Sequence, residues 1–165
     1  MVKAIIYDLD QTIIDSQIAE QERRARNWNL VYQKIKNFQI YEGFKEVFEK
    51  IRLDGIKVGI VTNSPETYAI KVIDQFGIPC DCLIDFFSVS KRKPNPEPFL
   101  KAIELLDVLA TDSISFGDRQ IDIQASNAAE IISVACTWGT LEYEKLKNSN
   151  PTKIISKPIQ ILQFL

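Results

Sequence analysis

The sequence predicts an α/β fold in which a mainly parallel sheet is covered by helices on both faces. Two observations support this prediction: short apolar runs alternate with longer amphipathic stretches, and glycines stand near the ends of several of these segments. The chain has 165 residues, 45% of them hydrophobic and 25% charged, which suits one compact domain with a buried core. We therefore expect a single domain over residues 1–165.

The expected elements follow one another along the whole chain. The predicted strands are residues 3–7, 57–62, 83–88, 113–116, 132–135 and 153–155. The predicted helices are residues 43–54, 65–76, 97–109, 121–129 and 158–165. Gly55 and Gly77 come directly after two of these helices, a common position for a residue that tolerates positive φ.

Residues 17–40 do not belong to this alternation. Their apolar residues recur at helical spacing over residues 17–39, between the first strand and the second βα unit. The segment is therefore an insertion at the C-terminal edge of the sheet, where open α/β folds bind ligands.

Composition and charge exclude several classes of protein. The chain has 20 Lys and Arg against 22 Asp and Glu, so a net charge of −2 gives no general reason to expect nucleic acid or an anionic membrane as partner. The apolar run at the N-terminus is too short for a signal peptide or a membrane span, and we expect a cytoplasmic protein. With three cysteines and no histidine, neither a disulfide framework nor a mixed zinc site is indicated. Proton transfer falls to other groups, such as carboxylates.

Polar residues follow the first two expected strands. Asp8 and Asp10 stand two residues apart, a spacing that in extended backbone points both side chains to the same side. Thr62 and Asn63 end the second strand and place a hydroxyl and loop amides at the same edge. Each signal has a structural alternative, because Asp8 could cap a turn and the polar loop could cap the next helix.

Lys93 and two further aspartates complete this set. Lys93 lies before the helix expected at 97–109, an unusual place for a cation unless an anion is also present. Asp118 and Asp122 are four residues apart where the next helix begins, so their carboxylates share one face. The structural alternative for Lys93 is a solvated basic loop. For Asp118 and Asp122 the alternative is that they only interact favourably with the dipole of the helix that begins there. Acids, a hydroxyl and a lysine at neighbouring strand ends nevertheless surround one point.

The ordered set resembles the haloacid dehalogenase (HAD) superfamily. The segment 8–12 (DLDQT) is similar to its first motif, Thr62-Asn63 to the second, Lys93-Pro94 to the third, and the segment 117–122 (GDRQID) to the fourth. The resemblance covers nearly the whole chain. It includes Trp138-Gly139, a pair that is similar to phosphoglycolate-phosphatase-like members. It implies a three-layer Rossmann-like core with a short helical cap insertion at 17–40.

The resemblance also implies a Mg²⁺-dependent hydrolysis of phosphate monoesters. Asp8 is expected as the nucleophile that forms an aspartyl-phosphate, and Asp10 as the general acid and base. Mg²⁺ is expected on the Asp8 carboxylate, the Asp10 backbone carbonyl and Asp118, with Asp122 acting through bound water. Thr62, Asn63 and Lys93 are expected to bind the phosphate.

Two departures from the family pattern concern access and specificity. Gln11 replaces a glycine that is common in the first motif, and the insertion is much shorter than the cap domains of many relatives that act on small metabolites. The site is therefore expected to be open. The insertion carries a charge of +3, which either attracts an anionic substrate or marks a solvated amphipathic helix. Arg119 is a second candidate for contact with substrate.

The substrate is expected to be a phosphorylated small molecule or an exposed phosphate on a macromolecule. The main alternative function is a non-catalytic phosphate-binding or regulatory module with the same fold. Against it stands the joint presence of Asp8, Asp10, Lys93 and Asp118. Phosphotransfer to another acceptor is a further alternative, but it requires a cap that excludes water. Dehalogenation also occurs in the superfamily, but it does not require the second acid, so the presence of Asp10 counts against that chemistry.

Overall fold

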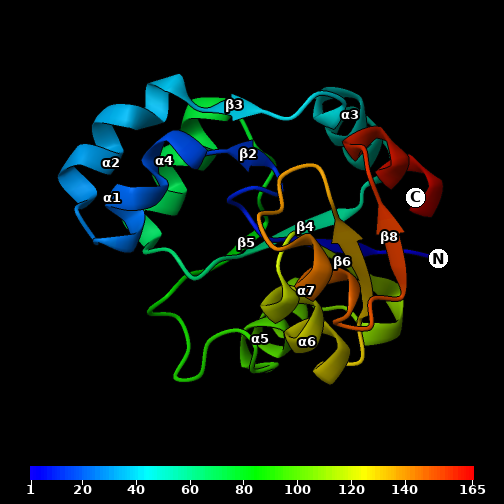
Figure 1. The fold of residues 1–165 in the computed structure, drawn as a ribbon. Helices are drawn as coiled ribbons and strands as arrows, with labels where there is room; N and C mark the ends of the chain where they lie inside the picture. The colour runs from blue at the N-terminus through cyan, green and yellow to red at the C-terminus, as the bar shows by residue number, and fades with distance from the viewer.

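A six-stranded parallel sheet forms the centre of the molecule, and the computed structural model describes all residues from 1 to 165. The strands lie in the order β5-β4-β1-β6-β7-β8 (Figure 1). Their bounds are β1 Ala4–Tyr7, β4 Lys57–Val61, β5 Cys82–Ile84, β6 Ser113–Gly117, β7 Ile132–Cys136 and β8 Lys153–Ile155. The predicted α/β class and parallel sheet are confirmed.

Helices cover both faces of this sheet, so the core has three layers. On one face lie α3 (Phe44–Asp54), α4 (Glu66–Phe76) and the 3-10 segment η4 (Pro158–Phe164). On the other lie α5 (Glu97–Leu106) and α6 (Gln120–Ala128). Strand β1 shows why both layers form. Its side chains alternate, with Ile5 and Tyr7 in the first apolar cluster and Ala4 and Ile6 in the second.

The insertion leaves and rejoins the core through a small antiparallel pair, β2 (Ile14–Asp15) and β3 (Gln39–Ile40). Between these strands the chain is helical in short pieces, which pack beside α4 in Figure 1. The pieces are η1 Gln17–Ala19, α1 Glu20–Arg24, α2 Trp28–Lys34 and η2 Ile35–Asn37. Residues 17–39 are therefore not one continuous helix. The break between α1 and α2 lies at Arg26, whose backbone is left-handed with φ 55° and cannot continue a right-handed helix.

Several other boundaries differ from the prediction. The strand expected over 83–88 is only β5, because the chain turns at Asp85, whose Oδ2 accepts the backbone N–H of Phe87 in the same loop and that of Glu66 in α4. The helix expected over 97–109 ends at Leu106, since Asp107 is left-handed with φ 51°. The C-terminal helix is a 3-10 helix. The strands β2 and β3, the turn η3 (Ala110–Asp112) and α7 (Tyr143–Lys147) were not predicted.

The longest helices, α3 and α4, have 11 residues each. No helix of the structure has the length and apolar character needed to cross a membrane.

Candidate active site

The register of the central strands sets the position of the site. Tyr7 of β1 pairs with Ile60 of β4 on one side and with Phe116 of β6 on the other, so the three strands end at the same level. The residues that follow are Asp8, Thr62 and Asp118, and they meet at the C-terminal edge of the sheet. This edge is one wall of a pocket of ≈ 770 Å³.

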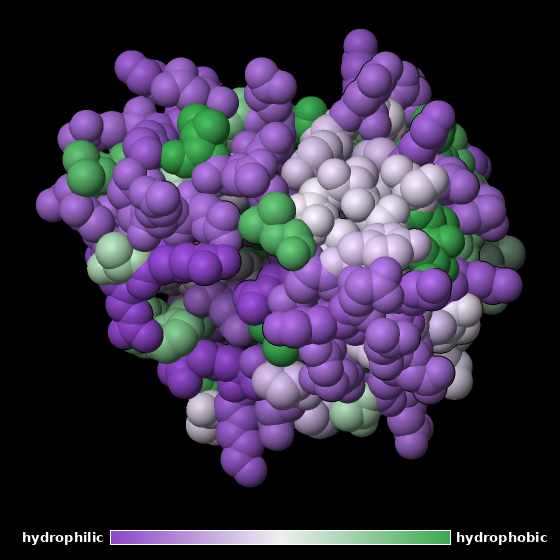
Figure 2. All heavy atoms as spheres, in the orientation of Figure 1, coloured by the Kyte–Doolittle hydropathy of each residue, from purple (hydrophilic) through white to green (hydrophobic).

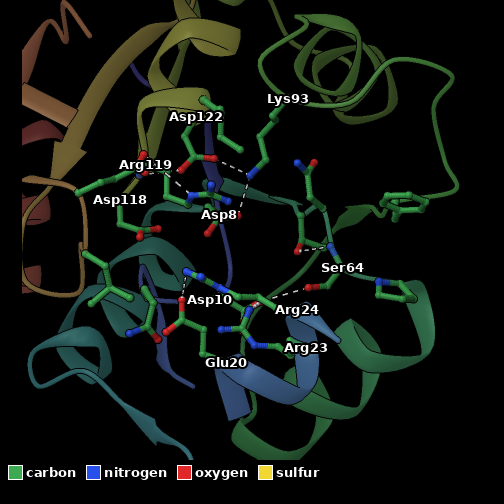
Figure 3. Close-up of a pocket in the computed structure, with 18 of the residues that line it drawn as sticks. Asp8, Asp10, Glu20, Arg23, Arg24, Ser64, Lys93, Asp118, Arg119 and Asp122 are labelled. Atoms are coloured by element: carbon green, nitrogen blue, oxygen red, sulfur yellow. Dashed lines mark hydrogen bonds and ion pairs between the residues drawn. The ribbon is translucent and has the colours of Figure 1, made fainter. Parts of the chain in front are cut away.

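All seven residues expected from the sequence line this pocket, and Figure 3 shows several of them pointing toward one another. They are Asp8, Asp10, Thr62, Asn63, Lys93, Asp118 and Asp122. They come from three strand ends, the start of α6 and the loop before α5, which are far apart in the sequence.

Three carboxylates form a compact cluster at the base of the pocket. One carboxylate oxygen from each of Asp8, Asp118 and Asp122 lies within 4.8 Å of the others. The three residues are 8%, 2% and 3% exposed, so water screens their mutual repulsion poorly. Asp10 is not part of this cluster.

Lys93 is the cation in contact with this cluster. Its Nζ donates to Oδ1 of Asp8 at 2.7 Å, to Oδ1 of Asp122 at 2.6 Å and to the backbone oxygen of Val61 at 3.0 Å. Burial alone would lower the pKa of the amine, but Asp122 and Asp8 outweigh burial and hold the pKa above its usual value. Lys93 is therefore a fixed positive charge.

One lysine does not balance three buried carboxylates. Burial is the largest cause that raises the pKa of Asp8, to about 6, although Lys93 acts in the opposite direction. Burial, followed by the charges of Asp8 and Asp122, raises the pKa of Asp118 well above its ordinary value. The cluster thus carries an excess of negative charge, in a set of hard oxygen donors of the kind that Mg²⁺ prefers.

Local hydrogen bonds fix the orientation of the acids. Oδ2 of Asp122 accepts the backbone N–H of Arg119 at 3.0 Å, which caps α6, while its other oxygen faces Lys93. The hydroxyl of Thr12 donates to Oδ1 of Asp118 at 3.0 Å. Trp138 then donates its Nε1–H to the backbone oxygen of Thr12 at 2.9 Å. The side chains are thus held by neighbouring backbone as well as by one another.

Asp10 points away from the cluster toward the insertion. Its Oδ1 accepts hydrogen bonds from Ser16 at 2.6 Å and Tyr68 at 2.5 Å, and its Oδ2 accepts one from Ser64 at 3.2 Å. Arg23 of α1 lies 3.1 Å from Oδ2 and completes this set of partners. The carboxylate is thus held between the insertion, α4 and the loop after β4.

The two polar residues after β4 form the start of a tight turn. Oγ1 of Thr62 accepts the backbone N–H of Ser64 at 3.0 Å, and Thr62 itself is buried. Asn63, between them, is half-buried and lines the pocket. The turn therefore presents polar groups beside Asp8 without a charged residue of its own.

Gln11 stands where a glycine is common in the family's first motif, and its backbone is left-handed with φ 62°. Its Oε1 accepts the backbone N–H of Ser16 at 2.8 Å, which stabilises the turn. The loop after β7 approaches this turn closely, because a Cβ on Gly139 would lie 2.0 Å from the backbone oxygen of Gln11. Glycine at 139 is therefore a steric requirement of this turn.

Sequence analysis did not identify the partners of Asp10. Arg23 entered only as one of the residues behind the +3 charge of the insertion, and Ser16 and Tyr68 were not candidates. No local signal marks them, because Tyr68 lies 58 residues from Asp10 and faces it only after α4 has packed on the sheet.

Fold and site together define a hydrolase of the α/β class with its acids at the C-terminal ends of parallel strands. The chain belongs to the haloacid dehalogenase-like hydrolase family, whose model matches residues 16–136. The resemblance drawn from the four motifs is confirmed.

Relatives support this assignment. A protein named "Putative pyrophosphatase PpaX" from Caldanaerobacter subterraneus subsp. tengcongensis is 32% identical, over 99% of this chain and 94% of its own length. A phosphoglycolate phosphatase of Xanthomonas campestris pv. campestris is 37% identical over 61% of this chain. The chain matches about half of that relative, 47% of its length.

The fold is also similar to solved structures. The crystal structure of a "predicted phosphoglycolate phosphatase" from Haemophilus somnus 129pt superimposes with a TM-score of 0.85 at 20% sequence identity. The match covers 99% of this chain and 97% of that one. At this identity the likeness shows the fold alone, and it agrees with the expected Rossmann-like core.

Proposed function

We propose that this chain is a Mg²⁺-dependent phosphatase that hydrolyses phosphate monoesters through an aspartyl-phosphate on Asp8. The observation that carries the proposal is the buried Asp8, which faces Lys93 on one side and two further aspartates on the other. The names of the relatives, phosphoglycolate phosphatase and pyrophosphatase, agree with phosphoryl chemistry.

The residues present fit a divalent cation. Asp8, Asp118 and Asp122 offer three carboxylates against the single charge of Lys93, which leaves two negative charges uncompensated in a buried site. Asp8 and Asp118 would hold Mg²⁺ directly with the backbone carbonyl of Asp10, and Asp122 would act through bound water. When bound, Mg²⁺ supplies positive charge that offsets the repulsion between the nucleophile and an anionic phosphate.

The chain's own residues divide the chemistry between them. A carboxylate oxygen of Asp8 forms a bond to phosphorus while the bond from phosphorus to the leaving oxygen breaks. Asp10 gives a proton to that leaving oxygen, and in the second step it takes a proton from the water that attacks phosphorus. This second attack releases inorganic phosphate and restores the carboxylate of Asp8.

Three residues hold the transferring group during these steps. Lys93 already contacts Asp8, so its charge lies next to the position where the phosphate bonds to that carboxylate. The hydroxyl of Thr62 and the amide of Asn63 bind phosphate oxygens from the neighbouring strand end. With no histidine in the chain, Asp10 supplies the proton transfer that histidine supplies elsewhere.

The whole chain acts as a single domain, with residues 17–40 as a minimal cap. In the alignment with the Caldanaerobacter relative, 208 positions are spanned by a chain of 165 residues, so that relative has at least 43 residues without a counterpart here (208 minus 165). A shorter cap leaves the pocket accessible to a phosphorylated small molecule or to an exposed phosphate on a macromolecule.

The experiment is phosphate release from a panel of phosphomonoesters, with Mg²⁺ and with EDTA. Asp8→Asn should abolish turnover, while Asp74→Asn on the exposed face of α4 makes the same chemical change outside the pocket and should retain it. Turnover by Asp8→Asn equal to that of Asp74→Asn would refute the nucleophile. Absence of turnover in every arm would favour a phosphate-binding module instead.

A further inference from the structure

One ion pair joins the insertion to the residues of the site. In Figure 2 the surface over the insertion is mostly hydrophilic, as expected for short helices with a solvated face. Arg24 and Arg26 belong to this exposed surface. Arg23 of α1 does not, because its side chain is only 16% exposed and lies 3.1 Å from Oδ2 of Asp10 (Figure 3). Its Nε is buried without a hydrogen-bond partner, so Arg23 is not a solvated surface cation.

Arg23 differs in kind from the other partners of Asp10. Ser16, Ser64 and Tyr68 contribute neutral hydroxyls, which both donate and accept hydrogen bonds. The guanidinium of Arg23 carries a charge and only donates. Water screens the ion pair little, since the side chain of Asp10 is 11% exposed. Arg23 is also the one partner that comes from the insertion, and its charge makes it the strongest single influence on the orientation of Asp10.

The direction of Asp10 agrees with the position that a leaving group would occupy. The attacking and leaving oxygens lie roughly in line across phosphorus during phosphoryl transfer. A phosphate attacked by Asp8 therefore has its leaving oxygen on the side away from the acidic cluster. Asp10 is not part of that cluster and is directed toward the insertion, where Arg23 holds it.

We infer that Arg23 is a positioning residue for Asp10, so that the insertion takes part in proton transfer as well as bordering the pocket. The inference rests on the proposed function. In the first step a proton passes from Asp10 to the leaving oxygen, as the bond from that oxygen to phosphorus breaks and Asp8 bonds to phosphorus. In the second step water bonds to phosphorus, its proton passes to Asp10 and the bond to Asp8 breaks. Arg23 acts in both steps through Asp10.

The test compares two substrates that differ in their need for a proton. The leaving oxygen of phenyl phosphate requires one, whereas 2,4-dinitrophenyl phosphate releases a stabilised anion. General acid catalysis contributes about 10²–10⁴-fold. With Mg²⁺ present, Arg23→Met should therefore lower kcat/KM for phenyl phosphate at least about tenfold more than for 2,4-dinitrophenyl phosphate. Equal losses for both substrates would overturn the inference, because an arginine that only fastens the insertion or binds the transferred phosphate affects both alike.

Lys34→Met is the matched control. Lys34 forms an ion pair with Glu22 at 2.6 Å within the insertion and does not line the pocket. This variant should keep the wild-type ratio of kcat/KM between the two substrates, and a ratio that falls as far as in Arg23→Met would overturn the inference. Arg23→Gln also removes the charge and should show the same change of ratio, so it replaces Arg23→Met if that variant does not fold.

The second step has its own measurement. During turnover of 2,4-dinitrophenyl phosphate, acid quenching should trap a larger fraction of phosphorylated protein in Arg23→Met than in the wild type. The reason is that the first step then needs no proton from Asp10, while the attack of water still needs Asp10 as a base. A fraction no larger than in the wild type would count against a role for Arg23 in this step.

These measurements also separate the inference from the proposed function. Hydrolysis of both substrates by the wild-type protein, with an unchanged ratio in Arg23→Met, would overturn the positioning role and retain the phosphatase. Hydrolysis of neither substrate by the wild-type protein would refute the phosphatase and the positioning role with it.

Discussion

Replacing Lys93 with methionine removes the single positive charge that contacts the acidic cluster. The side chain is 2% exposed and makes two ion pairs, at 2.7 Å to Asp8 and 2.6 Å to Asp122. Methionine fills similar space but leaves both carboxylates buried without their partner. Breaking a buried ion pair by removing one partner costs about 3–5 kcal/mol, a large fraction of the stability of a typical domain.

Urea unfolding in EDTA measures this loss, and Lys101→Met is the matched control. Nζ of Lys101 donates to the backbone oxygen of Ser88 at 2.6 Å and has no carboxylate partner, so that substitution should cost only about 1 kcal/mol. Mg²⁺ should recover part of the stability lost in Lys93→Met, because a cation at the cluster replaces some of the missing charge. A loss in Lys93→Met no larger than that in Lys101→Met would refute the electrostatic reasoning.

Four further predictions concern the cluster and its surroundings. Asp118→Asn should raise Tm in EDTA at pH 7.5, because burial and nearby carboxylates raise the pKa of this acid and its ionised form destabilises the metal-free fold. Burial raises the pKa of Asp8 from 3.8 to about 6, so the metal-free protein should lose up to about 3 kcal/mol of stability as the pH rises through this interval, measured by urea unfolding. Tyr68→Phe removes the hydrogen bond to Asp10 and should lower kcat about tenfold with little change in KM. Gly139→Ala should cost about 2 kcal/mol or more by thermal unfolding, because its Cβ would lie 2.0 Å from a backbone oxygen.

Different results would contradict each of these expectations. A lower Tm for Asp118→Asn in EDTA would mean that the acids do not repel one another in the folded protein. The stability of Asp8→Asn is measured over the same pH range and subtracted from that of the wild-type protein. A difference that rises between pH 4 and pH 6 would reverse the sign of the pKa shift assigned to Asp8. A change confined to KM would remove Tyr68 from the positioning of Asp10, and a neutral Gly139→Ala would show that the turn moves freely.

Sequence reasoning predicted the base of the site because parallel strands impose it. Asp8, Thr62 and Asp118 each follow a strand, and the carboxyl ends of parallel strands meet at one edge whatever the loops do. Lys93 was found by its position before α5, although its contacts with Asp8 and Asp122 bridge 85 and 29 residues of sequence. The parallel topology of the sheet thus allowed these distant residues to be placed at one edge, which local sequence patterns alone could not do.

The surroundings of Asp10 were beyond prediction for the opposite reason. Arg23 reaches Asp10 from α1 of the insertion, whose short helices lie beside α4, and neither this packing nor the left-handed break at Arg26 has a glycine or proline to signal it. The left-handed backbone of Gln11 was equally hard to predict, because the side chain of Gln11 itself stabilises the turn. Short segments whose conformation depends on distant packing leave little trace in the sequence.

The central claim is that Asp8 itself receives the phosphoryl group. Mass spectrometry of protein quenched in acid during turnover with Mg²⁺, followed by peptide mapping, tests this claim most directly. The account predicts that the peptide containing Asp8 gains the mass of one phosphoryl group, and that Asp8→Asn shows no such gain. A phosphoryl group on another residue, or turnover with none on the protein, would contradict it.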